Sequence, residues 1–377
     1  MQLSETVKLY MTREQKSLIT GAMTEYINTV NSLVSDAVNG ISISKYTTAD
    51  VIANLPSALT NQCIRDAQAI FRKYKKDCRE ADRKNAVLSE EGKDKKVIVT
   101  VPVLRNPCCY INNQNYKVNG DYIGFPVLVN GKSKRLSIKT GMTDNQKTVF
   151  ANNKLGTMRI VCKNRKIVAQ IVYETAEPVH RSEGNVMGVD LGIKCPAVSY
   201  DSNGKIRFYG NGRRNKYMRR HYACLRKKLQ KAKHVDAVKR IKDKEQRIMR
   251  DIDHKISKNI VKTAVAHDVK IIKLERLSNI RSATRTSRKN NHSLHNWSFY
   301  RLAMFIEYKA KLAGITVEYV DPAYTSQTCP VCGHVHHAND RNYVCKCGFH
   351  VHRDVLGAMN ICNSTEYVGD SNIRHTA

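Results

Sequence analysis

The order of short apolar runs in the second half of the chain constrains the fold most. Turn residues separate three runs of strand-forming residues, at 186–190, 197–200 and 205–209. Apolar residues then recur at helical spacing between Leu225 and Ile260. The expected elements after that are a strand, a helix, a strand and a final helix, at 269–275, 297–313, 315–320 and 355–363. Strands and helices in this order predict an α/β domain built on one sheet.

Acidic residues accompany three of these elements. Asp190 is in the first run, Glu275 closes the run at 269–275, and Asp354 precedes the last helix. We expect Asp190 near the middle of a buried strand, where an isolated carboxylate is costly to ionise and a bound metal offsets the cost. The element order fits an RNase H-like core. In such a core Glu275 would lie on a strand beside Asp190, and the last helix would cross the same sheet edge.

Three carboxylates suit two Mg²⁺ (or Mn²⁺) ions about 3.5 to 4 Å apart, one activating water and the other stabilising the leaving oxygen. Asp190 would bridge the ions, and Glu275 and Asp354 would each complete one site. Hydrolysis would then leave a 5′-phosphate and a 3′-hydroxyl. Each acid alone has a structural explanation: Asp190 could cap a turn, and Asp354 could cap the last helix. Glu275 could pair with Arg276 or Arg281, but the joint placement favours catalysis.

Four of the twelve cysteines fall within nineteen residues, and these are Cys329, Cys332, Cys345 and Cys347. A Gly follows each pair, and Gly can adopt the positive φ that aims backbone amides at sulfur. The pattern predicts one structural, tetrahedral Zn²⁺. The second pair is tighter than usual, so His350 or His352 is an alternative ligand in place of Cys345 or Cys347. We interpret the eight scattered cysteines as core or surface thiols.

The chain is strongly basic, with 64 Lys and Arg against 33 Asp and Glu and a net charge of +31. Such charge favours a polyanionic partner, because each phosphate contact releases counterions. A solubilising or ribosomal-type surface is the alternative. Basic residues gather on the helix predicted from Leu59 and within 213–250. The candidate nucleic-acid contacts are Lys73, Lys76, Arg219, Arg220, Arg226, Lys227, Lys228 and Lys231.

The N-terminal part of the chain reads as a strand followed by helices. Thr12 and Gln15 fit a capping box, so a helix should begin there. Apolar residues at 59–74 recur three and four residues apart and predict a second helix. Residues 80–96 are charged and contain Gly92, which predicts a linker or an exposed loop.

Residues 97–174 show strand patterns. The runs at 97–103 and 122–129 are rich in β-branched residues, and Asn130-Gly131 is a strong hairpin turn. Apolar residues alternate at 167–173. An antiparallel sheet or a small barrel is expected, which could bind nucleic acid or serve only as a support.

At 377 residues with 41% hydrophobic content, the chain is long enough for two or three domains with cores of their own. It has no run of eighteen apolar residues, and its first residues lack the regions of a signal peptide. We therefore expect no membrane partner and a location in the cytoplasm.

With these residues in view, the chain resembles the TnpB family of transposon-encoded RNA-guided nucleases, which are related to the type V CRISPR effectors. The shared motifs follow the family's order, and the main ones are Gly188-Val189-Asp190-Leu191-Gly192, Leu274-Glu275-Arg276-Leu277, Tyr324-Thr325-Ser326-Gln327, the four clustered cysteines and Arg353-Asp354. The family's three RuvC carboxylates map onto Asp190, Glu275 and Asp354. The sequence departs from the family in its shortened second cysteine pair and in Leu356-Gly357-Ala358, where the family often has Asn-Ala-Ala.

The resemblance implies a domain organisation. It predicts an N-terminal wedge β-barrel with a helical insertion, then a RuvC domain with an inserted zinc ribbon. The implied boundaries are the first wedge strand at 1–11, the helical recognition insertion at 12–95, the rest of the wedge barrel at 96–180, the RuvC domain at 181–327 and 349–363, the zinc ribbon at 328–348 and a tail at 364–377.

The resemblance also implies the partners. These are a guide RNA from the transposon end and double-stranded target DNA with a short adjacent motif, bound by one protein monomer with one RNA. Pairing would carry the sequence specificity while the protein holds the backbones. The alternatives are a nuclease-inactive RNA-guided DNA-binding regulator, a CRISPR-associated miniature type V effector and a strand-transferring transposase.

Overall fold

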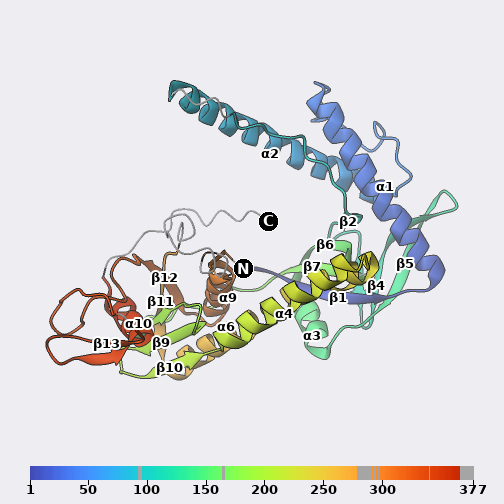
Figure 1. Ribbon diagram of the computed structural model, residues 1–377. Coiled ribbons are helices and arrows are strands. Elements are labelled where there is room, and N and C mark those ends of the chain that lie inside the picture. Colours follow the sequence, from blue (N-terminus) through green and yellow to red (C-terminus); the bar gives the residue numbers. More distant parts are fainter. Residues whose placement is uncertain are drawn as a thin grey trace. The chain divides into compact units, whose positions relative to one another are not determined.

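The computed structural model describes residues 1–91, 96–163, 166–277, 291, 294–295, 297–338 and 340–365. The chain divides into two compact units, Met1–Ala176 and Glu177–Ala377. Figure 1 colours the first unit from blue to green and the second from green to red.

The first unit contains an antiparallel sheet of seven strands. The strands are β1 (Gln2–Tyr10), β2 (Cys108–Ile111), β3 (Lys117–Asn119), β4 (Tyr122–Val129), β5 (Lys132–Thr140), β6 (Lys154–Lys163) and β7 (Lys166–Glu174). Their order in the sheet is β2-β6-β7-β1-β5-β4-β3. Most of β1 pairs with β7, whereas its last residues, Leu9 and Tyr10, pair with β5. The sheet therefore curls at β1.

The hairpin predicted at Asn130-Gly131 is confirmed. Strands β4 and β5 pair in antiparallel fashion, from Tyr122 opposite Lys139 to Val129 opposite Lys132. Asn130 and Gly131 have φ of 51° and 74°, as a tight two-residue turn of this type requires. The period of two at 167–173 is also confirmed, because Ile167, Ala169, Ile171 and Tyr173 on β7 are buried.

The strand predicted at 97–103 is wrong, because this segment has no strand assignment. Its apolar side chains cover no core: Ile98 is 84% exposed and Val103 is 59% exposed. The amide and carbonyl of Val97 bond to the side chain of Asn85, so a side chain supplies the partners that a neighbouring strand would offer.

The helices of the first unit are α1 (Arg13–Val38), α2 (Ser57–Glu90) and α3 (Asp144–Asn152). The capping box that was predicted at the start of α1 is confirmed, with Thr12 as the N-cap and Gln15 as its partner. The loop predicted at 80–96 is wrong as far as Glu90, because α2 continues to that residue. Its charged residues are good helix formers, and buried Ala81 gives this part of the helix an apolar contact.

The second unit contains a sheet of five strands. The strands are β8 (Asn185–Asp190), β9 (Ala197–Asp201), β10 (Ile206–Tyr209), β11 (Val269–Glu275) and β12 (Thr316–Val320), and their order is β10-β9-β8-β11-β12. The first three strands are antiparallel, and β11 is parallel to both β8 and β12. A two-stranded sheet of β13 (Asn342–Val344) and β14 (His350–His352) lies further along the chain. The strands predicted for this half are confirmed.

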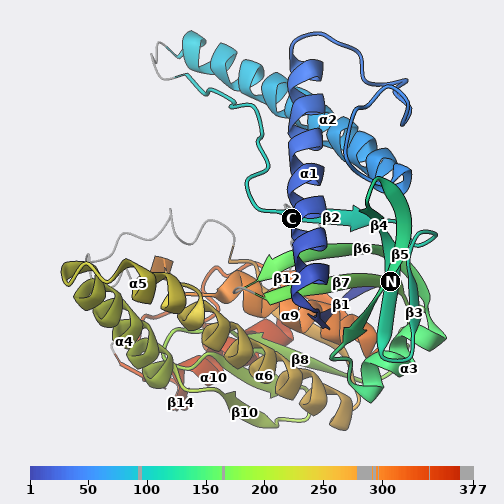
Figure 2. The same cartoon turned by 90° about the vertical axis from the view of Figure 1, so that its right-hand side faces the viewer.

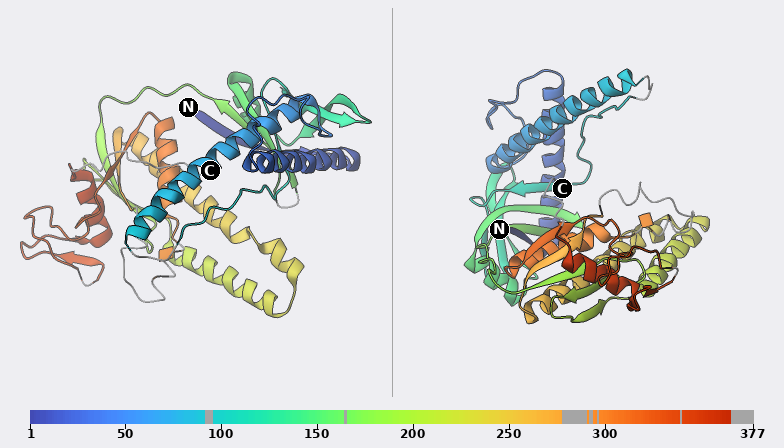
Figure 3. Two further views of the ribbon diagram at one scale, coloured as in Figure 1. Left: turned by 90° about the horizontal axis from the view of Figure 1, so that it is seen from above. Right: turned by 90° about the vertical axis from the view of Figure 1, so that its left-hand side faces the viewer.

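Helices pack on both faces of the five-stranded sheet. They are α6 (Lys244–Ala266) and α9 (Phe299–Leu312) on one face and α10 (Arg353–Asn363) on the other. Two more helices, α4 (Gly212–Lys231) and α5 (Val235–Ile241), lie beyond α6. Met187, Val189, Ile272 and Leu274 face the core formed with α6 and α9. The residues of β8 that alternate with Met187 and Val189 point to the opposite face, toward α10. Gly188 is one of them, and it lies directly against the backbone of α10. Figures 2 and 3 show α4 and α6 running side by side.

Candidate active site and thiol cluster

Asp190 and Glu275 are the last residues of two adjacent parallel strands. Leu274 on β11 is paired with Val189 on β8, so the next residue of each strand is one of the two acids. The expectation that Asp190 lies near the middle of its strand is therefore wrong. The end of the strand is the better place for a ligand, because the carboxyl ends of parallel strands open into a shared crevice.

Asp354 reaches the same place from α10. It lies in the first turn of this helix, whereas the N-cap is His352, whose Nδ1 accepts the amide of Asp354 at 3.2 Å. The alternative that Asp354 caps the helix is therefore wrong. The backbone of α10 rests directly on β8, since a Cβ on Gly188 would lie 2.2 Å from the carbonyl oxygen of Ala358.

Lys273 on β11 holds the other end of α10. Its side chain is buried, and its Nζ donates to the carbonyl oxygens of Cys362 at 3.1 Å and Ser364 at 2.7 Å. These are carbonyls at the C-terminal end of the helix, where a cation is favoured. Gly188 and Lys273 together fix the position of α10, and with it the position of Asp354.

The three carboxylates interact electrostatically. Burial raises the pKa of Asp190 well above its usual value, and the charges of Glu275 and Asp354 raise it further. Burial also raises the pKa of Glu275, against the hydrogen bond that Thr325 donates. A buried acid whose pKa is raised by two neighbouring carboxylates is short of positive charge, so the donor set fits divalent cations.

Two further side chains contact the acids, and we did not predict either as a site residue. Thr325 donates its hydroxyl to Oε1 of Glu275 at 2.5 Å. Arg341 forms an ion pair with Asp354. Thr325 belongs to one of the motifs of the family resemblance, which could have singled it out. Arg341 stands between the two cysteine pairs, where nothing in the sequence distinguishes it from other surface arginines.

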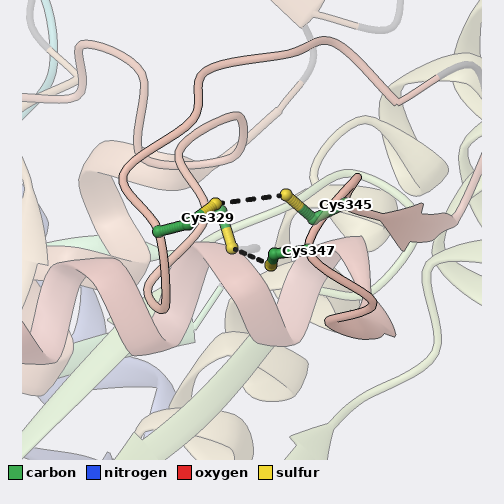
Figure 4. A group of neighbouring side chains, drawn as sticks. Cys329, Cys345 and Cys347 are labelled. Atoms are coloured by element: carbon green, nitrogen blue, oxygen red, sulfur yellow. Dashed lines mark hydrogen bonds between the residues drawn. The ribbon is translucent and has the colours of Figure 1, made fainter.

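The four clustered cysteines converge in the structure. Their sulfur atoms all lie within 4.8 Å of one another, and Figure 4 shows the side chains of Cys329, Cys345 and Cys347 pointing inward. Sγ of Cys329 lies 3.7 Å from Sγ of Cys347, and Sγ of Cys332 lies 3.5 Å from Sγ of Cys345. Sulfurs around a tetrahedral zinc are separated by about 3.8 Å, given a Zn–S bond of about 2.3 Å. The four thiols therefore fit a zinc ion.

The loops around these thiols have the expected backbone. Gly333 and Gly348 have φ of 70° and 89°. Burial raises the pKa of Cys329, but amides of Cys332 and Val331 and the neighbouring thiols bring it down to about 7. Among the described residues, neither His350 nor His352 belongs to the group. The alternative of a histidine ligand is therefore not supported.

The eight candidate nucleic-acid contacts lie on two helices. Lys73 and Lys76 are exposed on α2, in the first unit. On α4, the exposed candidates are Arg220, Lys227, Lys228 and Lys231. The two remaining residues, Arg219 and Arg226, are partly buried. Arg226 pairs with Glu245 of α6 at 2.7 Å, so one of the eight has a structural role.

Two family models match the chain. A model described as a probable transposase matches residues 170–281, and a model described as a Cas12f1-like TNB domain matches residues 299–361. The second match covers α9, the thiol cluster and most of α10.

Curated proteins resemble the chain over much of its length. A TnpB-like protein of Methanocaldococcus jannaschii is 30% identical over 269 residues, which is 67% of this chain and 94% of that protein. The CRISPR-associated endodeoxyribonuclease Cas12f1 of Sulfoacidibacillus thermotolerans is 26% identical over 285 residues, which is 67% of this chain and 65% of that protein.

Solved structures show the same fold at low sequence identity. The structure of a Cas12f1–sgRNA–target DNA complex matches with a TM-score of 0.67 and 13% identity, over 94% of this chain and 84% of that one. The mini-RNA-guided endonuclease CRISPR-Cas_phi3 matches with a TM-score of 0.57 and 12% identity, over 96% and 92%. The chain is thus an α/β protein with the fold of the small type V effectors.

The chain belongs to the TnpB family, as the length and identity of the archaeal match show. No helix in the described part of the chain is both long enough and apolar enough to span a bilayer.

Proposed function

We propose that the protein is an RNA-guided DNA endonuclease with a RuvC-type active site formed by Asp190, Glu275 and Asp354. The observation that carries this proposal is the convergence of the three carboxylates, two from parallel strand ends and one from α10. The sheet order β10-β9-β8-β11-β12 is the order of an RNase H-like core. Membership of the TnpB family supports the same chemistry.

The three acids would hold two Mg²⁺ or Mn²⁺ ions, which supply an activated water and stabilise the leaving oxygen. The charges of Glu275 and Asp354 both raise the pKa of Asp190, so Asp190 would hold the ions together with each of the other two acids. Thr325 holds the carboxylate of Glu275 in one orientation. Arg341 orients Asp354, and its partly exposed guanidinium is free to bind a DNA phosphate on the solvent side.

The partners in this proposal are a guide RNA from the transposon end and double-stranded DNA with a short adjacent motif. The net charge of +31 supports a polyanionic partner. The solved Cas12f1 structure with the same fold contains a guide RNA and target DNA. We further propose that the curled sheet of the first unit is the wedge domain, that α1 and α2 form the recognition insertion, and that the thiol cluster is a zinc ribbon.

The test begins with the protein purified together with its RNA. Sequencing that RNA defines the guide, and DNA matching the guide is then offered with Mg²⁺. We expect cutting by the wild type, and none by Asp190→Ala, which should still bind the RNA and the DNA. Asp236→Ala is the matched control, because Asp236 is an exposed acid on α5 in the same unit. Undiminished cutting by Asp190→Ala would remove Asp190 from the mechanism.

The match to a model described as a probable transposase keeps strand transfer as a second candidate. The two activities give different products, because a transposase joins DNA ends that a nuclease leaves free. Recovery of joined DNA from the same reaction would favour the transposase, and recovery of cut DNA alone would favour the nuclease.

A further inference from the structure

A cavity of about 580 Å³ lies in the second unit between α4, α6 and the start of α9. One part of its wall is the loop that leaves β8, with Gly192 only two residues beyond Asp190. The cavity therefore adjoins the loop that follows the strand carrying Asp190, on the side of the sheet that α6 and α9 cover. Its volume is within the range of sites that enclose a small molecule.

The wall of this cavity is apolar on one side and cationic on the other. The apolar side is formed mainly by Ile193, Pro196, Met249, Trp297 and Leu302. The cationic side is formed by Lys216, Arg219, Arg220 and Arg226 of α4. A flat apolar group joined to an anion complements such a wall, and a nucleotide has this composition.

Arg219 is a partly buried cation of this wall. The two acids of the wall are already paired, Glu245 with Arg226 at 2.7 Å and Asp253 with Arg301 at 2.6 Å. Within the residues that the structure describes, the guanidinium of Arg219 forms no ion pair or hydrogen bond. Burial lowers the pKa of Arg219, which is the effect of a charge held away from water. A phosphate would supply the missing partner.

We propose that this cavity binds one unstacked nucleotide of the DNA strand that enters the acidic site, with the base against Trp297 and Met249 and the phosphate against Arg219. The inference rests on the proposed nuclease function and adds to it a binding site at the loop that follows Asp190. A nucleotide can enter only if its base is unpaired and unstacked. The cavity would thus select single-stranded DNA and hold it against the loop that follows Asp190.

Trp297 makes the proposal directly measurable, because it is the only tryptophan of the chain. Its fluorescence therefore comes from a single residue, which is part of the cavity wall. The experiment titrates short oligothymidylate, unrelated to the guide, into the full-length protein–RNA complex in an Asp190→Ala background. Stacking of a base on Trp297 should quench the emission in a saturable way.

Two pairs of variants locate the bound nucleotide. Ala223→Phe fills the cavity from α4, and its control is Cys224→Phe on the next residue, which is exposed and outside the cavity wall. Arg219→Gln removes the internal cation, and its control is Lys262→Gln, an exposed lysine of α6 outside the wall. We expect each cavity variant to raise the half-quenching concentration about tenfold, the size of effect that a lost stacking or phosphate contact produces. Both controls should match the parent protein.

Three results would overturn the proposal: no quenching, equal losses in a variant and its control, or equal quenching by inorganic phosphate at the same phosphate concentration. The last result would define a simple anion site. The experiment distinguishes failure of the proposed nucleotide site from failure of the proposed nuclease function. If the wild type cuts guide-matched DNA but the fluorescence of Trp297 does not change on titration, only the nucleotide site in the cavity is rejected. If the wild type does not cut guide-matched DNA, the proposed nuclease function is rejected.

Discussion

Arg341 forms an ion pair with Asp354, so the segment between the two cysteine pairs contributes directly to the acidic site. The backbone reinforces this contact, because the amide of Arg353 donates to the carbonyl oxygen of Arg341 at 2.7 Å. The side chain of Arg341 is 40% exposed and that of Asp354 is 13% exposed. The thiol cluster and the carboxylates are therefore structurally coupled through adjacent residues.

The first prediction concerns Arg341→Ala. Loss of the guanidinium leaves Asp354 without its cationic partner and removes the group that we assign to a DNA phosphate. We expect the cutting rate to fall about 10²-fold, as for other losses of one charge-stabilising donor. Less Mg²⁺ should be needed for half-maximal rate, because Arg341 no longer competes for Asp354. Single-turnover cutting over a range of Mg²⁺ concentrations measures both effects.

Arg341→Lys is the control for this change, since it keeps the charge and loses the planar fork. It should have a rate between those of the wild type and Arg341→Ala. An unchanged rate and an unchanged Mg²⁺ requirement in Arg341→Ala would show that the ion pair has no part in the reaction.

The sequence predicted the second unit better than the first. Its strands are short apolar runs bounded by turn residues, so the pattern predicts the fold, and the three acids drew attention because they accompany such elements. Asp190 and Glu275 end their strands, and Asp354 lies in the first turn of α10. The segment at 97–103 shows why the sequence pattern was a poorer guide in the first unit. Its composition is that of a strand, but a strand also needs a neighbour, and here the side chain of Asn85 binds the backbone of Val97 instead.

Contacts between distant parts of the chain could not be predicted from local patterns. The cavity arginine Arg219 looks like any other member of the basic face of α4, because sequence spacing does not show that Glu245 is already paired with Arg226. The role of Arg341 was missed for the same reason, since its partner Asp354 follows thirteen residues later across a two-stranded sheet.

The second prediction is that Asp190→Asn stabilises the metal-free protein near neutral pH. The pKa of Asp190 is raised above its ordinary value of 3.8 in the folded state. Between the two pKa values the folded state binds more protons than the unfolded state, so the free energy of unfolding falls as pH rises through this window. Asparagine does not ionise, so the variant does not lose stability as the pH rises. Calorimetry without Mg²⁺ should show a higher Tm for the variant near neutral pH and similar values in acid.

Mg²⁺ supplies the control for this prediction. It should raise the Tm of the wild type by binding only the folded state, and it should raise that of Asp190→Asn much less. A variant that is less stable than the wild type near neutral pH would show that Asp190 is compensated in some other way.

The third prediction concerns Thr325→Val, which keeps the shape of the side chain and removes its donor. Burial raises the pKa of Glu275, and the bond from Thr325 opposes that rise. Without the bond the pKa of Glu275 should rise further, so a higher pH is needed to ionise it. The acidic limb of the pH–rate profile should move to higher pH while the plateau changes less. Thr325→Ser keeps the hydroxyl and should keep the wild-type profile; an unmoved limb in Thr325→Val would count against a role for Glu275.

The fourth prediction tests how α10 is positioned. A Cβ on Gly188 would lie 2.2 Å from the carbonyl oxygen of Ala358 and 2.4 Å from the amide nitrogen of Cys362. These are backbone atoms, so α10 would have to move as a whole. We expect Gly188→Ala to lower the free energy of unfolding by about 3 kcal/mol or more, at the upper end of overpacking effects.

Gly21→Ala is the contrasting variant, because nothing lies within 4 Å of its added Cβ in the middle of α1. It should stabilise the protein by up to about 1 kcal/mol through helix propensity. Denaturant unfolding of both variants checks the two signs. A neutral Gly188→Ala would mean that α10 is not fixed against β8.

The fifth prediction is that zinc removal disables cutting through the position of Arg341 and α10. Cys329, Cys345 and Tyr343 form a small buried cluster with Leu356, which lies on α10 two residues after Asp354. So few apolar residues cannot hold a fold without a metal. Cys345→Ser should therefore lose the bound zinc and most of the cutting activity, and added Mg²⁺ should not restore it.

Cys224→Ser is the matched control, because Cys224 is an exposed cysteine of α4 outside the thiol group. It should retain about one zinc per chain, the number that a four-thiol site binds, together with the wild-type cutting rate. Zinc content by mass spectrometry and the cutting rate are measured on the same samples. A zinc-free Cys345→Ser protein that cuts at the wild-type rate would separate the thiol cluster from the acidic site, and the contact between Arg341 and Asp354 would then have to persist without the metal.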